Sequence, residues 1–174
     1  PPPPPPPPPP LFFSTHTTAN SMLRSLVGSE MCIRDRKGRV SIPSQFRSIL
    51  FQDGSHKMFC YPSLDAEAID AGGNRLSREI YALMDNLDPY SDEKDYLSTA
   101  LFGLSEELRI DSDGRVILSD ALIQHAQISD EVIFVGLGQK FQIWEPNRFS
   151  NYLQDAQKKV KEQRLLLSKK SKGC

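Results

Sequence analysis

Two stretches of this chain carry the same pattern of residues, and this internal repeat limits the possible folds more than any other feature. The first stretch is residues 37–47, KGRVSIPSQFR, and the second is residues 113–123, DGRVILSDALI. Each runs from a turn glycine through an arginine and a short β-branched strand to a small polar residue that opens a helix. Each copy then ends in an aromatic strand followed by a proline, at residues 58–62 and 141–146. Such self-similarity indicates duplication of one supersecondary unit.

The turns of the two copies have matching chemistry. Gly38 and Gly114 suit the positive φ of a tight hairpin turn. Asp35, Asp111 and Asp113 suit the same turns, because their carboxylates accept hydrogen bonds from nearby backbone amides. Each unit is therefore predicted to run strand, turn, strand, short helix, strand. Residues 131–135 and 140–144 flank a GLGQ turn and predict a hairpin in the second unit.

The remaining segments have different patterns. Residues 75–108 show apolar residues at helical spacing, interrupted at Pro89, which predicts two helices linking the repeats. From Pro146 the chain becomes a basic, amphipathic helix. The first ten residues are prolines, which favour an extended polyproline II segment, with a spacer or SH3-type ligand as the functional alternative.

Residues 25–36, SLVGSEMCIRDR, resemble the conceptual translation of a sequencing adaptor. We therefore expect residues 1–36 to be a non-native, disordered segment, so that the first repeat lacks its opening strand and leaves a sheet edge exposed. On this interpretation Asp35 matches the turn motif by accident. The predicted organisation is that segment followed by four parts: a first repeat at 37–66, a helical linker at 67–108, a second repeat at 109–150 and a basic C-terminal helix at 151–174.

Composition excludes several classes of protein. The net charge of −1 gives no overall basic excess, so any contact with nucleic acid must come from local patches. Cys32, Cys60 and Cys174 form neither a CxxC pair nor a cluster with histidine, which favours a reducing, cytoplasmic compartment and no metal or other cofactor. No apolar run is long enough to cross a bilayer. We also expect no enzymatic activity and no catalytic residues, because neither an activated nucleophile nor paired catalytic carboxylates can be recognised.

The paired motifs, together with VGLGQKFQIWEP at residues 135–146, resemble the MraZ family, whose two AbrB-like units each carry an Asp-x-x-Gly-Arg motif. The resemblance covers residues 37 to about 149, and Ser119 stands where the family usually has proline. It implies a mixed β/α, mainly β fold: a duplicated, swapped-hairpin β-barrel of the double-ψ type with linking helices. It further implies a ring-like homo-oligomer in the cytoplasm, associated with the nucleoid, that binds double-stranded DNA at repeated promoter boxes upstream of the division and cell-wall gene cluster.

The resemblance also suggests which residues meet DNA. It places the DNA-reading arginine at Arg39, in a stretch from Lys37 to Arg47 that holds three basic and no acidic residues. We expect Lys37 and Arg47 to contact phosphates, with Gly38 shaping the turn. The structural alternative is that Arg39 pairs with the turn aspartate and only closes the hairpin.

The second motif lies in a more acidic stretch, because residues 105–120 hold five acidic residues against two arginines. There the favoured expectation is that Arg115 pairs with Asp111 across the turn at Gly114, with DNA contact as the alternative.

Other features have simpler readings. The basic C-terminal end is more typical of a solvated helix terminus than of a DNA-binding tail. Phe134, Phe141 and Trp144 are expected in the core.

The competing function is an AbrB-like interaction module, antitoxin-style or scaffold, that binds a protein partner. Salt would separate the two, because DNA binding weakens steeply as salt rises whereas an apolar contact does not.

Overall fold

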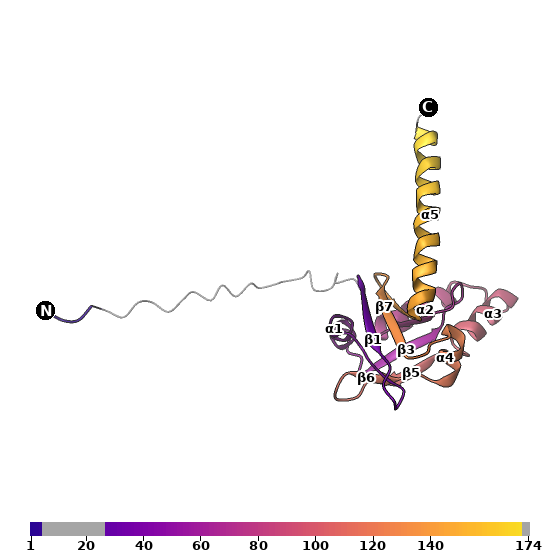
Figure 1. Cartoon of the computed structure of the whole chain (residues 1–174). Coiled ribbons are helices and arrows are strands. Elements are labelled where there is room, and N and C mark those ends of the chain that lie inside the picture. The colour runs from indigo at the N-terminus through magenta and orange to yellow at the C-terminus, as the bar shows by residue number, and fades with distance from the viewer. Residues whose placement is uncertain (5–26, 172–174) are drawn as a thin grey trace.

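The computed structural model describes residues 1–4 and 27–171, and Figure 1 shows their arrangement. The predicted polyproline segment lies mostly outside these residues. The described residues form eight strands and five helices, in the order β1 (Ser29–Ile33), β2 (Arg39–Ser41), α1 (Ser44–Gln52), β3 (Lys57–Pro62), β4 (Ile69–Gly72), α2 (Asn74–Asp85), α3 (Asp92–Leu101), β5 (Glu106–Arg109), β6 (Arg115–Ile117), α4 (Asp120–Ala126), β7 (Glu131–Gly136), β8 (Phe141–Trp144) and α5 (Pro146–Ser171).

The strands form two antiparallel sheets. Six strands pair in the order β1-β7-β8-β4-β3-β5, and β2 and β6 form a separate two-stranded ribbon. The predicted hairpin of the second repeat is confirmed as β7 and β8, and the two predicted linking helices are confirmed as α2 and α3.

The two repeats interleave within this fold. In the structure one repeat comprises β1 to β4 and the other β5 to β8. Strand β1 pairs with β7, β2 with β6, β3 with β5 and β4 with β8, so each of these pairs joins one repeat to the other. Neither repeat therefore completes its own sheet. The pairings leave β1 and β5 as the sheet edges, so a closed swapped-hairpin barrel remains a prediction.

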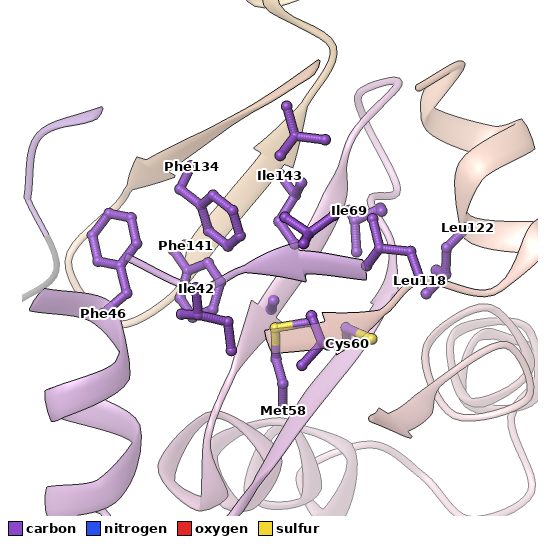
Figure 2. Close-up of a cluster of buried hydrophobic side chains, with 14 of the residues drawn as sticks. Ile42, Phe46, Met58, Cys60, Ile69, Leu118, Leu122, Phe134, Phe141 and Ile143 are labelled. Carbon is purple, nitrogen blue, oxygen red and sulfur yellow. The ribbon is translucent and has the colours of Figure 1, made fainter. Parts of the chain in front are cut away.

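Equivalent residues of the two repeats meet in one core, part of which Figure 2 shows. Phe46 of α1 stacks on Phe141 with ring centroids 5.3 Å apart and lies 6.0 Å from the ring of Phe134. The predicted burial of Phe134, Phe141 and Trp144 is confirmed. Four equivalent pairs are buried together: Val40 with Val116, Ile42 with Leu118, Phe46 with Leu122, and Leu50 with Ala126. In this shared core a change in the packing of one copy is felt by the other.

The beginning of the fold differs from the prediction. Residues 29–33 form β1, which pairs along β7, so the expectation that the first repeat lacks an opening strand is wrong. The backbone amides and carbonyls of β7 bond to β1 whatever side chains β1 carries, which is why an unfavourable sequence can still occupy this place. Met31 and Ile33 nevertheless remain 57% and 73% exposed. The edge that was expected to stay open is therefore filled, and the exposed edge on this side of the sheet is β1 itself.

Two other expectations need correction. The segment predicted as a helical linker, 67–108, begins with β4, a central strand whose residues are all buried, and ends inside β5. The described helices also contain more residues than the strands, since α5 alone has 26, so the fold is mixed α/β rather than mainly β.

The second face of the large sheet is covered in two places. Helices α2 and α3 pack on Phe59 and Tyr61 of β3, and the start of α5 packs on Trp144. Between them a polar chain is buried, in which Asp70 accepts hydrogen bonds from Lys140 Nζ at 2.6 Å and Gln142 Nε2 at 2.7 Å. Gln142 Oε1 in turn accepts from the indole of Trp144 at 2.9 Å. This chain satisfies polar groups that would otherwise be costly to bury.

Candidate nucleic-acid interface

The β2–β6 ribbon brings the two repeat motifs onto one surface. Its register sets Arg39 opposite Ile117 and Ser41 opposite Arg115. Side chains alternate between the faces of a strand, so these four residues share the outer face of the ribbon, while the central valine pair points into the core. Ser41 and Ile117 are exposed, and both arginines are half-buried. The outer face therefore presents two arginines placed diagonally across a pseudo-symmetric ribbon.

In the first turn Asp35 fixes the position of the Arg39 side chain. Asp35 Oδ1 accepts hydrogen bonds from the backbone amides of Lys37 at 2.8 Å and Arg39 at 3.0 Å, and Asp35 Oδ2 accepts from Arg39 Nε at 2.6 Å. Gly38 adopts a φ of +78°, as the turn requires. Asp35 thus makes the contacts of a true motif residue, which counts against the expectation that its match is accidental.

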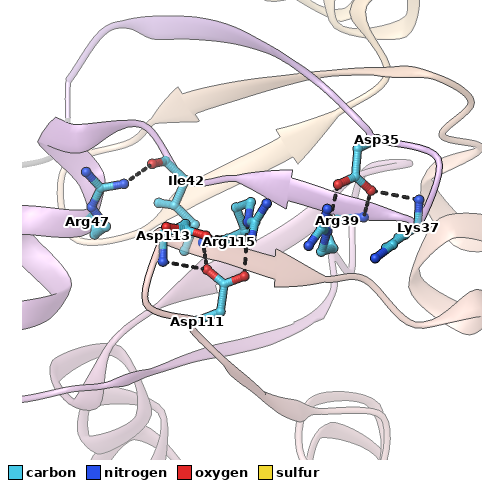
Figure 3. A network of polar contacts seen from close by, with 8 residues as sticks. All are labelled: Asp35, Lys37, Arg39, Ile42, Arg47, Asp111, Asp113 and Arg115. Atoms are coloured by element: carbon cyan, nitrogen blue, oxygen red, sulfur yellow. Dashed lines mark hydrogen bonds and ion pairs between the residues drawn. The ribbon is translucent and has the colours of Figure 1, made fainter.

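The second turn repeats this geometry, as Figure 3 shows. Asp111 Oδ1 accepts from the amides of Asp113 and Arg115, both at 2.9 Å, and Asp111 Oδ2 accepts from Arg115 Nε at 3.0 Å. Gly114 has a φ of +75°. Arg115 also bonds through Nη2 to Asp113 at 2.7 Å. The expected pairing of Arg115 with Asp111 is confirmed as a contact, but Arg39 makes the same contact with Asp35, so pairing does not distinguish the two arginines.

Both turn aspartates are held in the charged form. The pKa of Asp35 lies below its usual range, chiefly because the backbone amide of Arg39 donates to it and also because of the Arg39 side chain. The pKa of Asp111 is lowered in the same way by the backbone and side chain of Arg115. At neutral pH each motif is therefore an ionised Asp–Arg pair that fixes the direction of its guanidinium group.

Two further arginines lie over the turn glycines. Arg47 of α1 donates from Nη1 to the carbonyl of Ile42 at 3.3 Å, and its guanidinium covers Gly114 of the other repeat. The side chain of Arg34 lies over Gly38 and donates to the carbonyl of Ser129 at 3.2 Å. Sequence reasoning missed Arg34 because it fell in the segment set aside as non-native.

The two turns differ in charge. The first carries Arg34, Arg36, Lys37 and Arg39 against Asp35 alone, and Arg36 and Lys37 are exposed. The second turn has two aspartates against one arginine, and Arg47 beside it supplies the balancing charge. The basic potential of the ribbon is therefore concentrated at its first turn.

Other kinds of site receive no support from the described residues. Within 27–171, histidine, cysteine and acidic side chains do not gather into a group that could hold a metal ion. None of the described helices has the length and apolar character needed to span a membrane.

Comparison with known proteins adds independent information. A family model described as "MraZ protein, putative antitoxin-like" matches residues 101–169. A relative from Xanthobacter autotrophicus is 51% identical over 139 residues, which cover 80% of this chain and 88% of the relative. A relative from Beijerinckia indica is 53% identical over 134 residues, covering 77% and 82%. A third, from Rickettsia bellii, is 43% identical over 133 residues, covering 76% and 89%.

Each of these relatives is named Transcriptional regulator MraZ. This duplicated, interleaved fold therefore belongs to the class of transcriptional regulators. The identities extend over most of each relative and are far above the level at which homology is in doubt. The chain belongs to the MraZ family, and the resemblance seen in its paired motifs is confirmed.

Proposed function

We propose that the protein is a sequence-specific DNA-binding transcriptional regulator that reads DNA through the outer face of the β2–β6 ribbon. One observation carries this proposal: two motif arginines share the exposed face of a two-stranded ribbon, and each is held by an aspartate. A two-stranded ribbon fits the major groove, where arginine recognises the O6 and N7 atoms of guanine. A guanidinium group fixed in advance loses less entropy when it binds.

The two ends of the ribbon have different tasks in this proposal. Among the described residues, hydrogen bonds and ion pairs join the Arg39 guanidinium only to Asp35, through Nε, which leaves its Nη groups to meet a base. Arg115 is bonded through both Nε and Nη2, so its contribution to base reading is smaller. Lys37, exposed in the basic first turn, contacts phosphates. Arg47 contacts phosphates from the side of the second turn while covering Gly114.

Assembly and targets complete the proposal. A chain with a net charge of −1 gains little from its overall field, so one ribbon binds weakly. A ring-like homo-oligomer would engage several repeated boxes at once and multiply that affinity by avidity. We propose, as the family resemblance implies, that these boxes lie upstream of the division and cell-wall gene cluster, and that the protein works in the cytoplasm at the nucleoid. The cross-pairing of repeats supports a swapped-hairpin arrangement.

Fluorescence anisotropy with labelled promoter DNA across a salt series tests this function. The proposal expects affinity to fall steeply with salt, and Lys37→Ala to reduce the slope of log K against log salt by about one. Arg78→Ala is the matched control, since it removes an exposed arginine from α2, away from the ribbon. Binding that ignores salt and Lys37 would refute DNA contact through the first turn and would favour the alternative, an AbrB-like oligomeric module that binds a protein partner.

A further inference from the structure

Helix α5 extends far beyond the surface that supports it. Its first turns are anchored, since Phe149 and Tyr152 contact the ring of Trp144 and Arg148 pairs with Glu67. The chain from residue 157 to 169 is exposed throughout. At about 1.5 Å per residue, the part beyond the anchor is some tens of ångströms long. Figure 1 shows it standing clear of the body. Isolated helices of this length are marginal in water, so a covering partner would stabilise it.

One side of this helix carries a row of apolar residues, and the exposed Leu165 and Leu166 lie on its other sides. Leu153, Val160 and Leu167 follow one another at intervals of seven residues, and Ala156 and Arg164 lie beside them at helical spacing. We call these five residues the α5 stripe. Val160 and Leu167 are 53% and 68% exposed. The two acidic residues of the exposed helix, at positions 155 and 162, fall on the opposite side at about 100° per residue.

The α5 stripe is set in a basic helix, because residues 147–169 contain six basic and two acidic residues. A stripe that is apolar at its centre and basic at its margins fits a surface that is apolar and acidic. Pairing two copies of α5 in parallel would bring two lysine-rich ends together, which is unfavourable.

The hairpin of α2 and α3 offers a surface of that complementary kind. Tyr81 stacks on Phe102, the C-cap residue of α3, with ring centroids 4.5 Å apart, so this part of α2 lies next to the C-terminal end of α3. Asp85 follows Tyr81 by one turn, and Asp92, Asp95 and Tyr96 share the outer side of α3. We call these the acidic face: Tyr81, Asp85, Asp92, Asp95 and Tyr96. All five are exposed, and residues 85–96 contain five acidic residues against one lysine.

We propose that the α5 stripe of one copy docks on the acidic face of a second copy of this chain. The same chain cannot make this contact, because α5 is one unbroken helix that carries the stripe away from the body, while α2 and α3 lie beside its base (Figure 1). The two surfaces differ from each other, so the contact is head-to-tail, and a contact of this type closes into a ring when its rotation allows. This inference rests on the proposed homo-oligomer and names its interface.

Charge exchange between the two surfaces tests the interface in the full chain without DNA. The hairpin variant is Asp85→Lys with Asp95→Lys, and the stripe variant is Lys161→Glu with Arg164→Glu. The control, Lys158→Glu with Lys169→Glu, makes the same charge change on the side of α5 opposite the stripe. Light scattering during size exclusion reports assembly against a chain mass of 19.6 kDa, and circular dichroism checks that each variant is folded.

The proposal expects the wild type and control to assemble, each variant alone to dissociate at least tenfold more readily, and an equal mixture of the two variants to reassemble. In that mixture the altered face of the hairpin variant meets the altered stripe of the stripe variant, and the unaltered face of the stripe variant meets the unaltered stripe of the hairpin variant. Each of these contacts joins opposite charges again. A hairpin variant that assembles like the wild type would overturn the proposal in favour of α5 pairing with α5. A mixture that stays dissociated, or a monomeric wild type, would overturn it as well. Because mass is measured without DNA, these failures are separate from failure of the ribbon to bind DNA.

Discussion

Replacing Gly114 with alanine should destabilise the fold more than the same change at its repeat equivalent, Gly38. Both glycines have a positive φ, so an added Cβ costs about 1 kcal/mol at either position. At Gly38 the new methyl group meets only the Arg34 side chain, at 3.5 Å, which is ordinary contact. At Gly114 it would lie 2.1 Å from Nη1 and 2.7 Å from Cδ of Arg47, so that side chain must move.

Displacing Arg47 adds to the cost at Gly114. The movement breaks the hydrogen bond to the carbonyl of Ile42, which is worth about 1 kcal/mol, and loses packing over the turn. We therefore expect a loss of about 2 to 3 kcal/mol for Gly114→Ala against about 1 kcal/mol for Gly38→Ala. In an Arg47→Ala background the obstacle is gone, and Gly114→Ala should cost about 1 kcal/mol.

Urea unfolding followed by the fluorescence of Trp144 measures these differences, since this single tryptophan is buried. All variants must be compared at one protein concentration, because assembly stabilises the folded state. Equal costs at Gly38 and Gly114 would refute the reasoning. So would an excess cost at Gly114 that survives removal of the Arg47 side chain.

Four other predictions follow from the same structure. Phe46→Ala should cost about 3 to 5 kcal/mol in urea unfolding, because it empties the centre of the aromatic cluster; a loss below about 1 kcal/mol would contradict the packing. Burial raises the pKa of Cys60 to about 12, so a thiol reagent at neutral pH should modify it only after unfolding. Because the pKa of Asp111 is lower in the folded protein than its ordinary value, the ionised carboxylate stabilises the second turn above about pH 4, and this stabilisation is lost as the pH falls further. The free energy of unfolding of Asp111→Asn should therefore vary less with pH below about 4 than that of the wild type. Ile33→Lys on the edge strand should reduce aggregation measured by turbidity, with no change in unfolding midpoint.

Much of the fold was predictable because the repeat has strong local signals. The glycine turns, the hairpin at β7 and β8 and the burial of Phe134, Phe141 and Trp144 all follow from residue type and spacing. Strand β4 was missed because it has only four residues, IDAG, whose small and polar side chains do not resemble a strand. Its Asp70 is explained by tertiary contacts with Lys140 and Gln142, which are about 70 residues away and invisible to local reasoning.

The candidate site was predicted in its residues but not in its geometry. Composition distinguished a basic first motif from an acidic second one, which favoured Arg39 over Arg115 as the arginine that reaches DNA. The register of β2 and β6 instead sets Arg39 and Arg115 on one face, each with the same aspartate contact. Pairing between strands so distant in sequence depends on the whole fold. The position of Arg47 over Gly114 of the other repeat is likewise a result of interleaving.

The central claim is that the ribbon reads base sequence, and the ratio of affinities for promoter and shuffled DNA tests it most directly. Arg39→Ala should lower that ratio about tenfold or more, equivalent to the roughly 1 to 3 kcal/mol of one bidentate base contact, while Lys37→Ala should weaken binding to both DNAs equally. If Arg39→Ala leaves the ratio unchanged and weakens both DNAs alike, Arg39 contacts only the phosphate backbone, and reading of sequence by this ribbon is contradicted.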